Sequence, residues 1–189
     1  MKVKRTLKMI VGCLLITNLC WAGITQEGDT LPPGVVIHNA PAISHEYIGS
    51  PSIVIMPDGT YIASHDYFGK KLSDTYIYRS GDRGNSWTPI AKLESLTWAT
   101  LFNRGKELYL IGISPKVTMG YGDFVVRRSL GFGRSWTEPK DEKSGLIRCG
   151  FYHCAPVPVV RHKGKYWRAM ENMGQEWGWG PFSALMTSI

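Results

Sequence analysis

Six residues in two parts of the chain combine groups that exchange protons with groups that hold polar ligands. They are His65, Asp66, Tyr152, His153, Arg168 and Glu171. A positioned imidazole or carboxyl group is the usual proton donor or acceptor in general acid–base chemistry, and arginine binds oxygen-rich partners through paired hydrogen bonds. The spacing of these residues does not fit a metal site, and His153 beside Cys154 is not a zinc pattern. We therefore expect no metal and no cofactor.

Each of these residues also has a structural alternative. A lone histidine is more often hydrogen-bonded at the surface or in the core than catalytic, and aromatic residues such as Trp177 and Trp179 often pack between sheets. Arg168 and Glu171 are three residues apart, so in a strand they point to opposite faces and need not form an ion pair.

Short apolar runs must position these side chains. Residues 52–56, 61–64, 75–79, 107–111 and 124–127 are rich in Ile, Val, Tyr and Phe, and Gly, Pro, Asp and Asn separate them. These runs have the length and composition of strands, and the chain lacks a sustained helical period. The sequence predicts an all-β fold.

An internal repeat organises these strands. The segment SGDRGNSWT begins at Ser80 and SLGFGRSWT begins at Ser129, a spacing of 49 residues. Glycine turns precede each copy, at residues 57–60 and 103–106, and a third such turn falls at 162–165. Each unit reads as strand, glycine turn, strand, long loop, strand, repeated turn, strand. Four antiparallel strands in about 50 residues is the size of a β-propeller blade.

The repeated turn has a structural logic of its own. Its Ser and Asp side chains bond to the backbone, its Gly permits a positive φ, and its Trp packs between sheets. We assign this structural role to Ser80, Asp82, Gly84 and Trp87 in the first copy and to Ser129, Gly133 and Trp136 in the second. Gly131 stands where the second copy should have Asp, so that turn must depend on Ser129 and the backbone.

The topology predicts where a site could lie. Glycine turns and repeated turns join strands at one end of each blade, so the remaining loops gather at the opposite end. The six residues named above belong to that opposite end, together with Thr97 and Trp98 of the second unit. Rings that stack on pyranose faces, mixed with groups that bond hydroxyls, are typical of sugar-binding sites.

The segment SGDRGNSW at residues 80–87 resembles the Asp-box, or BNR repeat, of the sialidase superfamily. The resemblance covers most of residues 23–189 and implies a six-bladed propeller, of which this chain would supply about three blades, as an N-terminal fragment. Asp-boxes also occur in propellers that do not hydrolyse sialic acid, so the motif indicates fold more than activity.

The resemblance also implies roles for individual residues. Sialidases place an acid/base Asp after the second strand of the first blade, where Asp66 and Asp74 lie; Asp66 is favoured because it is nearer the strand and adjoins His65. Sialidases also place a substrate-binding arginine before the first strand, whereas residues 47–51 read Tyr-Ile-Gly-Ser-Pro. The missing arginine counts against sialic acid as substrate. The tyrosine nucleophile and its glutamate partner would belong to later blades.

These observations predict an exported, sialidase-like, exo-acting glycoside hydrolase with a glycan substrate, in truncated form. Asp66 would be its general acid/base, and His65, Tyr152, His153, Arg168 and Glu171 would bind the substrate. One alternative is a non-catalytic glycan-binding propeller, and another is a truncated product that folds poorly.

The N-terminus predicts export. Lys2, Lys4, Arg5 and Lys8 precede an apolar run from residue 9 to 21, which is too short to span a bilayer. We expect residues 1–22 to be a signal peptide and the protein to be secreted or periplasmic. Its removal lowers the formal charge from +7 to +3, which does not favour nucleic acid or an anionic membrane as partner. Cys149 and Cys154 would remain, either as a small disulfide loop or as free thiols.

Overall fold

A computed structural model describes residues 34–69, 74–116, 121–153, 157–174 and 182–189. Residues 35–189 belong to one compact unit. This unit is built from antiparallel β-strands, and its described residues include one short 3-10 helix, η1 (Ala42–Ser44). The all-β prediction is confirmed, and each predicted strand run lies within or at the end of an observed strand.

The first sheet is a single blade. It contains β1 (Glu46–Ile55), β2 (Tyr61–Gly69), β3 (Thr75–Ser80) and β4 (Thr88–Leu93), hydrogen-bonded in that order. Gly59 closes the β1–β2 turn with a φ of 83°, which glycine adopts without steric cost. The predicted four-stranded unit is therefore present from its first strand to its last.

The second sheet joins what the sequence separates into two blades. It contains β5 (Thr97–Arg104), β6 (Glu107–Pro115), β7 (Gly122–Arg128), β8 (Leu146–His153), β10 (Lys165–Asn172) and β11 (Ser183–Ser188), with β9 (Val160–His162) paired to β10. Strand β8 pairs with β7, and its last two residues also pair with the end of β10. Tyr152 and His153 are therefore the last two residues of β8.

Side-chain alternation along the strands builds two cores. Ile62, Ile77, Leu96, Leu110 and Val125 are buried between the first sheet and the β5–β7 part of the second. The opposite face of β5–β7 packs with residues of β8 and β10, in a cluster that includes Ile111, Ile113, Phe124, Tyr152 and Met170. The strands β5–β7 are thus covered on both faces, as the middle blade of three would be.

The first copy of the repeated turn (residues 80–87), which we call the first Asp-box after the motif that it resembles, closes through side chains. Ser80 Oγ accepts the Gly84 amide at 2.8 Å and donates to Asp82 Oδ1 at 2.7 Å. Asp82 also accepts the backbone amide and the hydroxyl of Ser86, at 2.9 and 2.6 Å. These hydrogen bonds from Ser86 and Ser80 stabilise the carboxylate and lower the pKa of Asp82 to about 2.

The second Asp-box keeps the turn without the aspartate. Ser129 Oγ accepts the Gly133 amide at 2.7 Å, and Trp136 Nε1 donates to Gly133 O at 2.9 Å, as Trp87 does to Gly84 O at 3.0 Å in the first copy. Trp136 then forms a bridge with Ser129 beside the end of β7. Both boxes lie after the third strand of their units, as predicted.

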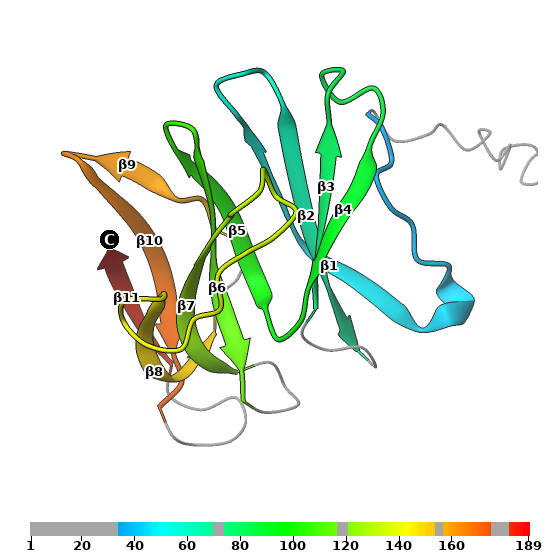
Figure 1. The fold of residues 1–189 in the computed structure, drawn as a ribbon. Coiled ribbons are helices and arrows are strands. Elements are labelled where there is room, and N and C mark those ends of the chain that lie inside the picture. Colours follow the sequence, from blue (N-terminus) through cyan, green and yellow to red (C-terminus); the bar gives the residue numbers. More distant parts are fainter. Residues whose placement is uncertain (1–33, 70–73, 117–120, 154–156, 175–181) are drawn as a thin grey trace, which may run out of the picture. The chain divides into compact units, whose positions relative to one another are not determined.

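The two kinds of connection separate to opposite ends of the strands. The glycine turns at Gly59, Gly105 and Gly164 and both Asp-boxes lie at one end, which is the upper side of Figure 1. The strand ends at Gly69, Pro115, His153 and Asn172 lie at the other end. We call these the turn end and the loop end.

Candidate functional site at the loop end

Trp98 lies in a β-bulge near the start of β5, where the pairing with β6 shifts between Thr97 and Thr100. Its φ is 50°, in the left-handed region that a bulky residue adopts only when its surroundings impose it. The Asp66 carboxylate, which projects from β2, supplies that constraint. Asp66 Oδ2 accepts the Trp98 amide at 2.6 Å and the Thr97 hydroxyl at 2.8 Å.

Arg168 holds the same residue through its backbone carbonyl. It projects from β10, and its Nη2 donates to Trp98 O at 2.7 Å while its Nη1 donates to Ile111 O at 2.5 Å. The residue is 1% exposed. Residues from β2 and β10 therefore fix the backbone of Trp98, and the three blades meet at this residue.

The Trp98 side chain belongs to a group of aromatic rings. Its ring lies 4.2 Å from the His153 ring, edge to face, and 5.9 Å from the Tyr121 ring, measured between centroids. His153 also lies 5.7 Å from Tyr121 and 5.9 Å from Phe182. These rings come from β5, from β8, and from the residues just before β7 and β11. They form an aromatic surface at the loop end.

His153 and Glu171 form the titratable pair of this surface. They are direct neighbours on β8 and β10, and His153 Nδ1 forms a short hydrogen bond with Glu171 Oε2. The side chains are 19% and 42% exposed, so a ligand at the surface could reach both. A carboxylate that orients an imidazole is an arrangement suited to proton transfer.

Asp66 is in a different position. It is 2% exposed, and its Oδ2 atom is taken up by the Thr97 and Trp98 groups. The structure therefore brings Asp66 to the predicted end of the blades, but as a buried group beneath the aromatic surface.

His65 and Tyr152 do not join this site. Successive side chains of a strand point to opposite faces, so His65 faces away from Asp66, on the other side of the first sheet. Tyr152 is 3% exposed and packs in the core with Phe124 and Met170. Of the six predicted site residues, the structure groups Asp66, His153, Arg168 and Glu171.

His65 lies in a separate cluster of rings. It stacks against His38 and Tyr76, with centroids 5.0 and 5.5 Å apart, and its Nε2 is 3.0 Å from the hydroxyl of Tyr78. Burial lowers the pKa of His65 and raises that of Tyr78 to about 12. His65 is thus a neutral, packed side chain at neutral pH.

Trp98, Thr97 and Tyr121 are not among the six predicted site residues, although the topology places the first two at the loop end. The bulge recurs in the structure: β1 has one at the equivalent place, where Ser50 has a φ of 49°, 48 residues before Trp98. The residue types at the two bulges differ, so the sequence repeat does not mark them. Only the pairing of the strands reveals the bulge.

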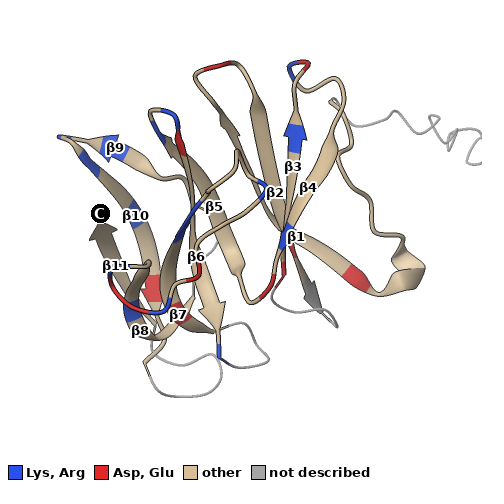
Figure 2. Cartoon of the chain, in the orientation of Figure 1, with Lys and Arg blue, Asp and Glu red and all other residues tan. Residues whose placement is uncertain are grey.

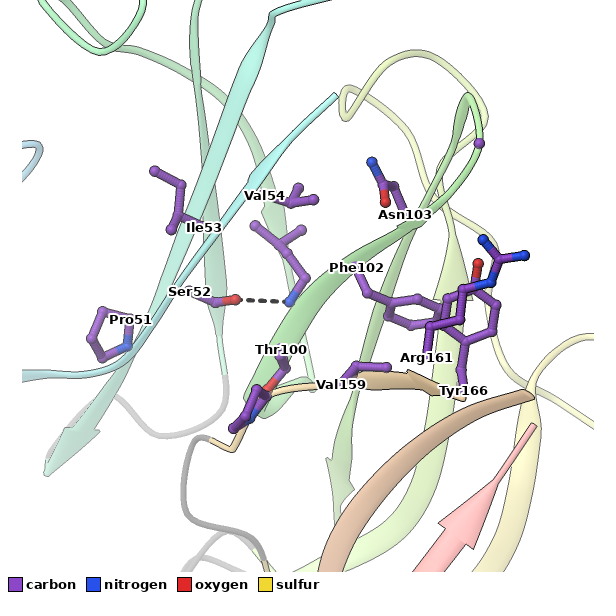
Figure 3. Close-up of a pocket in the computed structure, with 13 residues that line it drawn as sticks. Pro51, Ser52, Ile53, Val54, Thr100, Phe102, Asn103, Val159, Arg161 and Tyr166 are labelled. Carbon is purple, nitrogen blue, oxygen red and sulfur yellow. Dashed lines mark hydrogen bonds between the residues drawn. The ribbon is translucent and has the colours of Figure 1, made fainter. Parts of the chain in front are cut away.

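A cavity of about 520 Å³ is bordered by β1, β5 and the β9–β10 hairpin (Figure 3). Ser52 of β1, Thr100 and Asn103 of β5, and Arg161 and Tyr166 of the β9–β10 hairpin line it. Ser52 Oγ accepts the Leu101 amide at 2.9 Å, which joins the first sheet to the second. This hollow has the place that the axial channel has in a propeller.

The remaining expectations concern metals, membranes and cysteines. In the described ranges, His, Cys, Asp and Glu side chains form no group of three that could hold a metal ion. No helix among the described residues is long and apolar enough to cross a membrane. Cys149 is exposed on β8, whereas Cys154, Trp177, Trp179 and the expected signal peptide lie outside the described residues.

Comparison with solved structures finds the same fold in three structures of proteins described as an arabinanase or an arabinofuranosidase. An alpha-L-arabinanase from Penicillium chrysogenum, complexed with arabinobiose, is 18% identical over 73% of this chain and 45% of its own, with a TM-score of 0.50. The GH93 alpha-L-arabinofuranosidase of Fusarium graminearum, also with arabinobiose, is 13% identical over 67% of this chain and 41% of its own, with a TM-score of 0.51. A variant of an arabinofuranosidase from the same fungus, bound to an iminosugar inhibitor, gives a TM-score of 0.52 at 14% identity.

At such identities the likeness concerns the fold. The chain has the architecture of a partial β-propeller and spans less than half the length of these solved structures. No protein-family model and no curated protein matches the sequence.

Proposed function

We propose that this chain is part of a glycoside hydrolase that acts on a glycan bound at the loop end. The observation that carries the proposal is the His153–Glu171 pair, partly exposed beside the Trp98 ring. An aromatic face next to a hydrogen-bonded acid–base pair supplies two of the functions that glycoside hydrolysis needs, ring binding and proton transfer. The solved structures of similar fold are described as an alpha-L-arabinanase and an alpha-L-arabinofuranosidase, which supports the same reaction class.

The exposure of each site residue decides the role that we assign to it. Glu171 and His153 are assigned to proton transfer because both are partly exposed. Asp66, which the sequence favours as general acid/base, is assigned instead to positioning, since it is buried and holds the Trp98 amide. Hydrolysis also needs a second carboxylate or another nucleophile, and further blades would supply it.

The site favours a neutral sugar. Arg168 is 1% exposed and both of its Nη atoms donate to backbone carbonyls, so its guanidinium is not open to a substrate carboxylate. Residues 47–51 also lack the arginine of the sialidase pattern. The sialidase resemblance therefore extends to the Asp-box turns and not to the substrate. We propose pentosides such as arabinofuranosides as better substrates than sialosides.

The test is turnover of a glycoside panel by the full natural protein and its Glu171→Gln variant. Removing a group that transfers protons should lower kcat about 10²–10⁴-fold with KM little changed. Glu94→Gln is the matched control, because Glu94 is 79% exposed at the loop end and pairs with Lys92. A Glu171→Gln enzyme with full activity would remove this pair from the mechanism.

A non-catalytic glycan-binding propeller is the second candidate. The burial of Asp66 favours it, because the residue that most resembles a family acid/base is not open to a ligand. In that case the protein binds glycans from the panel and turns none of them over.

We also propose that residues 1–22 are removed during export. The mature protein would then begin at Gly23. Mass spectrometry of its N-terminal peptide should give the mass of a peptide that starts at this residue. A retained N-terminus on protein recovered outside the cytoplasm would contradict the proposal.

A further inference from the structure

The positive charge of the described chain gathers at the turn end. This surface consists of residues 56–60, 79–87, 104–107, 128–136 and 161–165, and Figure 2 shows Lys and Arg on several of these turns. Its basic residues are Arg79, Arg83, Arg104, Lys106, Arg128, Arg134, Arg161, Lys163 and Lys165; its acidic residues are Asp58, Asp82 and Glu107. The excess of six positive charges is larger than the formal +3 of residues 23–189. The charge is therefore segregated.

The second Asp-box adds apolar side chains to this surface. Leu130 and Phe132 occupy the places that Gly81 and Arg83 have in the first box, and they are 59% and 77% exposed. Phe132 has a φ of 53° and Arg83, its equivalent in the first box, has a φ of 62°, so this conformation belongs to the turn itself. Apolar side chains left this exposed bury little area on folding, which points to a binding role.

These apolar residues border a hollow. A cavity of about 530 Å³ lies between the β1–β2 turn and the second Asp-box, lined among others by Met56, Asp58, Arg79, Lys106, Leu130 and Phe132. Asp58 Oδ1 accepts the Thr60 amide at 2.9 Å, so this carboxylate is partly engaged within its own turn. The hollow has apolar walls and a volume in the range of small-ligand sites. On its rim Arg79 and Lys106 stand beside Asp58 and Glu107, and Glu107 is engaged by Arg128 and by the Tyr109 hydroxyl.

We propose that the turn end binds an anionic polysaccharide, with sugar rings against Phe132 and Leu130 and sulfate or carboxylate groups on Arg79 and Lys106. A chain of sugar rings presents both apolar C–H faces and regularly spaced anions, which matches this combination of surfaces. A membrane fits less well, because two exposed apolar side chains, Leu130 and Phe132, give little area to insert, and both also line the hollow. A duplex nucleic acid fits less well because it presents its phosphates outward and keeps its bases stacked inside, so that nothing in it would occupy the apolar walls.

The experiment compares two polymers that share a backbone. The full chain should bind dextran sulfate and not uncharged dextran, and polygalacturonate should bind if carboxylate also serves. Binding should weaken as salt rises from about 0.15 to 0.5 M, because exposed charges are screened. An Arg79→Gln/Lys106→Gln variant should bind at least about tenfold more weakly, the loss expected for hydrogen bonds to charged groups.

Two further variants make the result specific. Phe132→Asn removes the ring while keeping a residue that tolerates a positive φ, and it should also weaken binding severalfold. Lys143→Gln, an exposed lysine outside the turn end, should change nothing. Melting temperatures confirm that each variant is folded, and if the double variant is not, Lys106→Gln alone decides, since Lys106 is exposed in a turn.

Other outcomes overturn the proposal. Equal binding of dextran and dextran sulfate would show that charge does not contribute to recognition. Unchanged binding in Lys106→Gln and Phe132→Asn would show that the polymer does not bind at these residues. Anionic vesicles or duplex DNA binding as tightly as dextran sulfate would contradict a polysaccharide partner. Because Glu171→Gln leaves the turn end intact, this binding and the hydrolase activity succeed or fail separately.

Discussion

Asp82 and Gly131 occupy equivalent positions in the two Asp-boxes, and together they show what one side chain contributes to the turn. Asp82 accepts hydrogen bonds from Ser80 and Ser86, whereas the second turn keeps its Ser129 bonds without them. The pKa of Asp82 is lowered to about 2, so its contribution is present above the unfolded value near 4 and is lost as the pH falls toward 2. Asp82→Asn should lower the melting temperature at pH 6 and match wild type near pH 2. A constant difference between the two proteins across this range would contradict the assignment.

Gly131→Asp is the reciprocal change. The φ of Gly131 is not in the left-handed region, so Asp is allowed there, but an added Cβ would lie 3.2 Å from Ser135 Oγ. That contact requires the serine to shift by a few tenths of an ångström, toward the arrangement that Ser86 has with Asp82. We expect Gly131→Asp to raise the melting temperature, and a lower one would mean that the second turn cannot accommodate the carboxylate.

His65 should make stability depend on pH in a higher range. Burial holds its folded pKa below the unfolded value of 6.5, so its packing stabilises the protein above that pH and the stabilisation is lost as pH falls through the folded pKa. Denaturant unfolding at pH 7.5 and 5 should show lower stability at pH 5. His65→Phe keeps a ring in the stack and should reduce that difference; an unchanged difference would assign it to other groups.

At the scale of elements, the Trp98 bulge connects three strands. Asp66→Asn keeps an oxygen that can accept the Trp98 amide but loses the charge, so the free energy of unfolding should fall by about 1 kcal/mol. If Asp66 is a positioning residue, the full protein should lose activity with its pH profile unchanged in shape. Loss of one limb of that profile would make Asp66 the general acid/base that the sequence suggests.

The hairpin between β6 and β7 depends on Gly122. A Cβ at this position would lie 2.0 Å from Ser114 O and 2.7 Å from Pro115 Cα, and both belong to the backbone. Gly122→Ala should therefore lower the free energy of unfolding by about 1–3 kcal/mol and displace the neighbouring Tyr121. Gly81→Ala meets nothing within 4 Å and serves as control, with an expected change within about 0.5 kcal/mol. Equal effects of the two substitutions would contradict the steric explanation.

The elements also show how far sequence reasoning reaches. The Asp-boxes could be predicted because their hydrogen bonds join residues within eight positions of each other. The end of the blades at which Asp66, His153, Arg168 and Glu171 gather could be predicted, but the contacts around Trp98 could not, because this residue is held by residues 32 and 70 positions away. Strand alternation implies that His65 and Asp66 face apart, but which face meets the next blade depends on packing between sheets. The β8 strand, which joins two blades, follows from pairings that no local pattern marks.

At the scale of the whole unit, residues 35–189 hold the two proposed sites at opposite ends of the strands. The loop end holds the aromatic surface with His153 and Glu171, and the turn end holds the basic surface around Phe132. The strands between them pack through two buried clusters. A polymer held at one end and a glycan processed at the other would therefore not compete for the same residues.

The most direct measurement is a crystal structure of the full natural protein, as its Glu171→Gln variant, with an arabino-oligosaccharide bound. We predict a sugar ring against Trp98, with a hydroxyl or glycosidic oxygen about 3 Å from His153 or from residue 171. A ligand bound away from the loop end, with the Trp98 surface empty, would contradict the central claim.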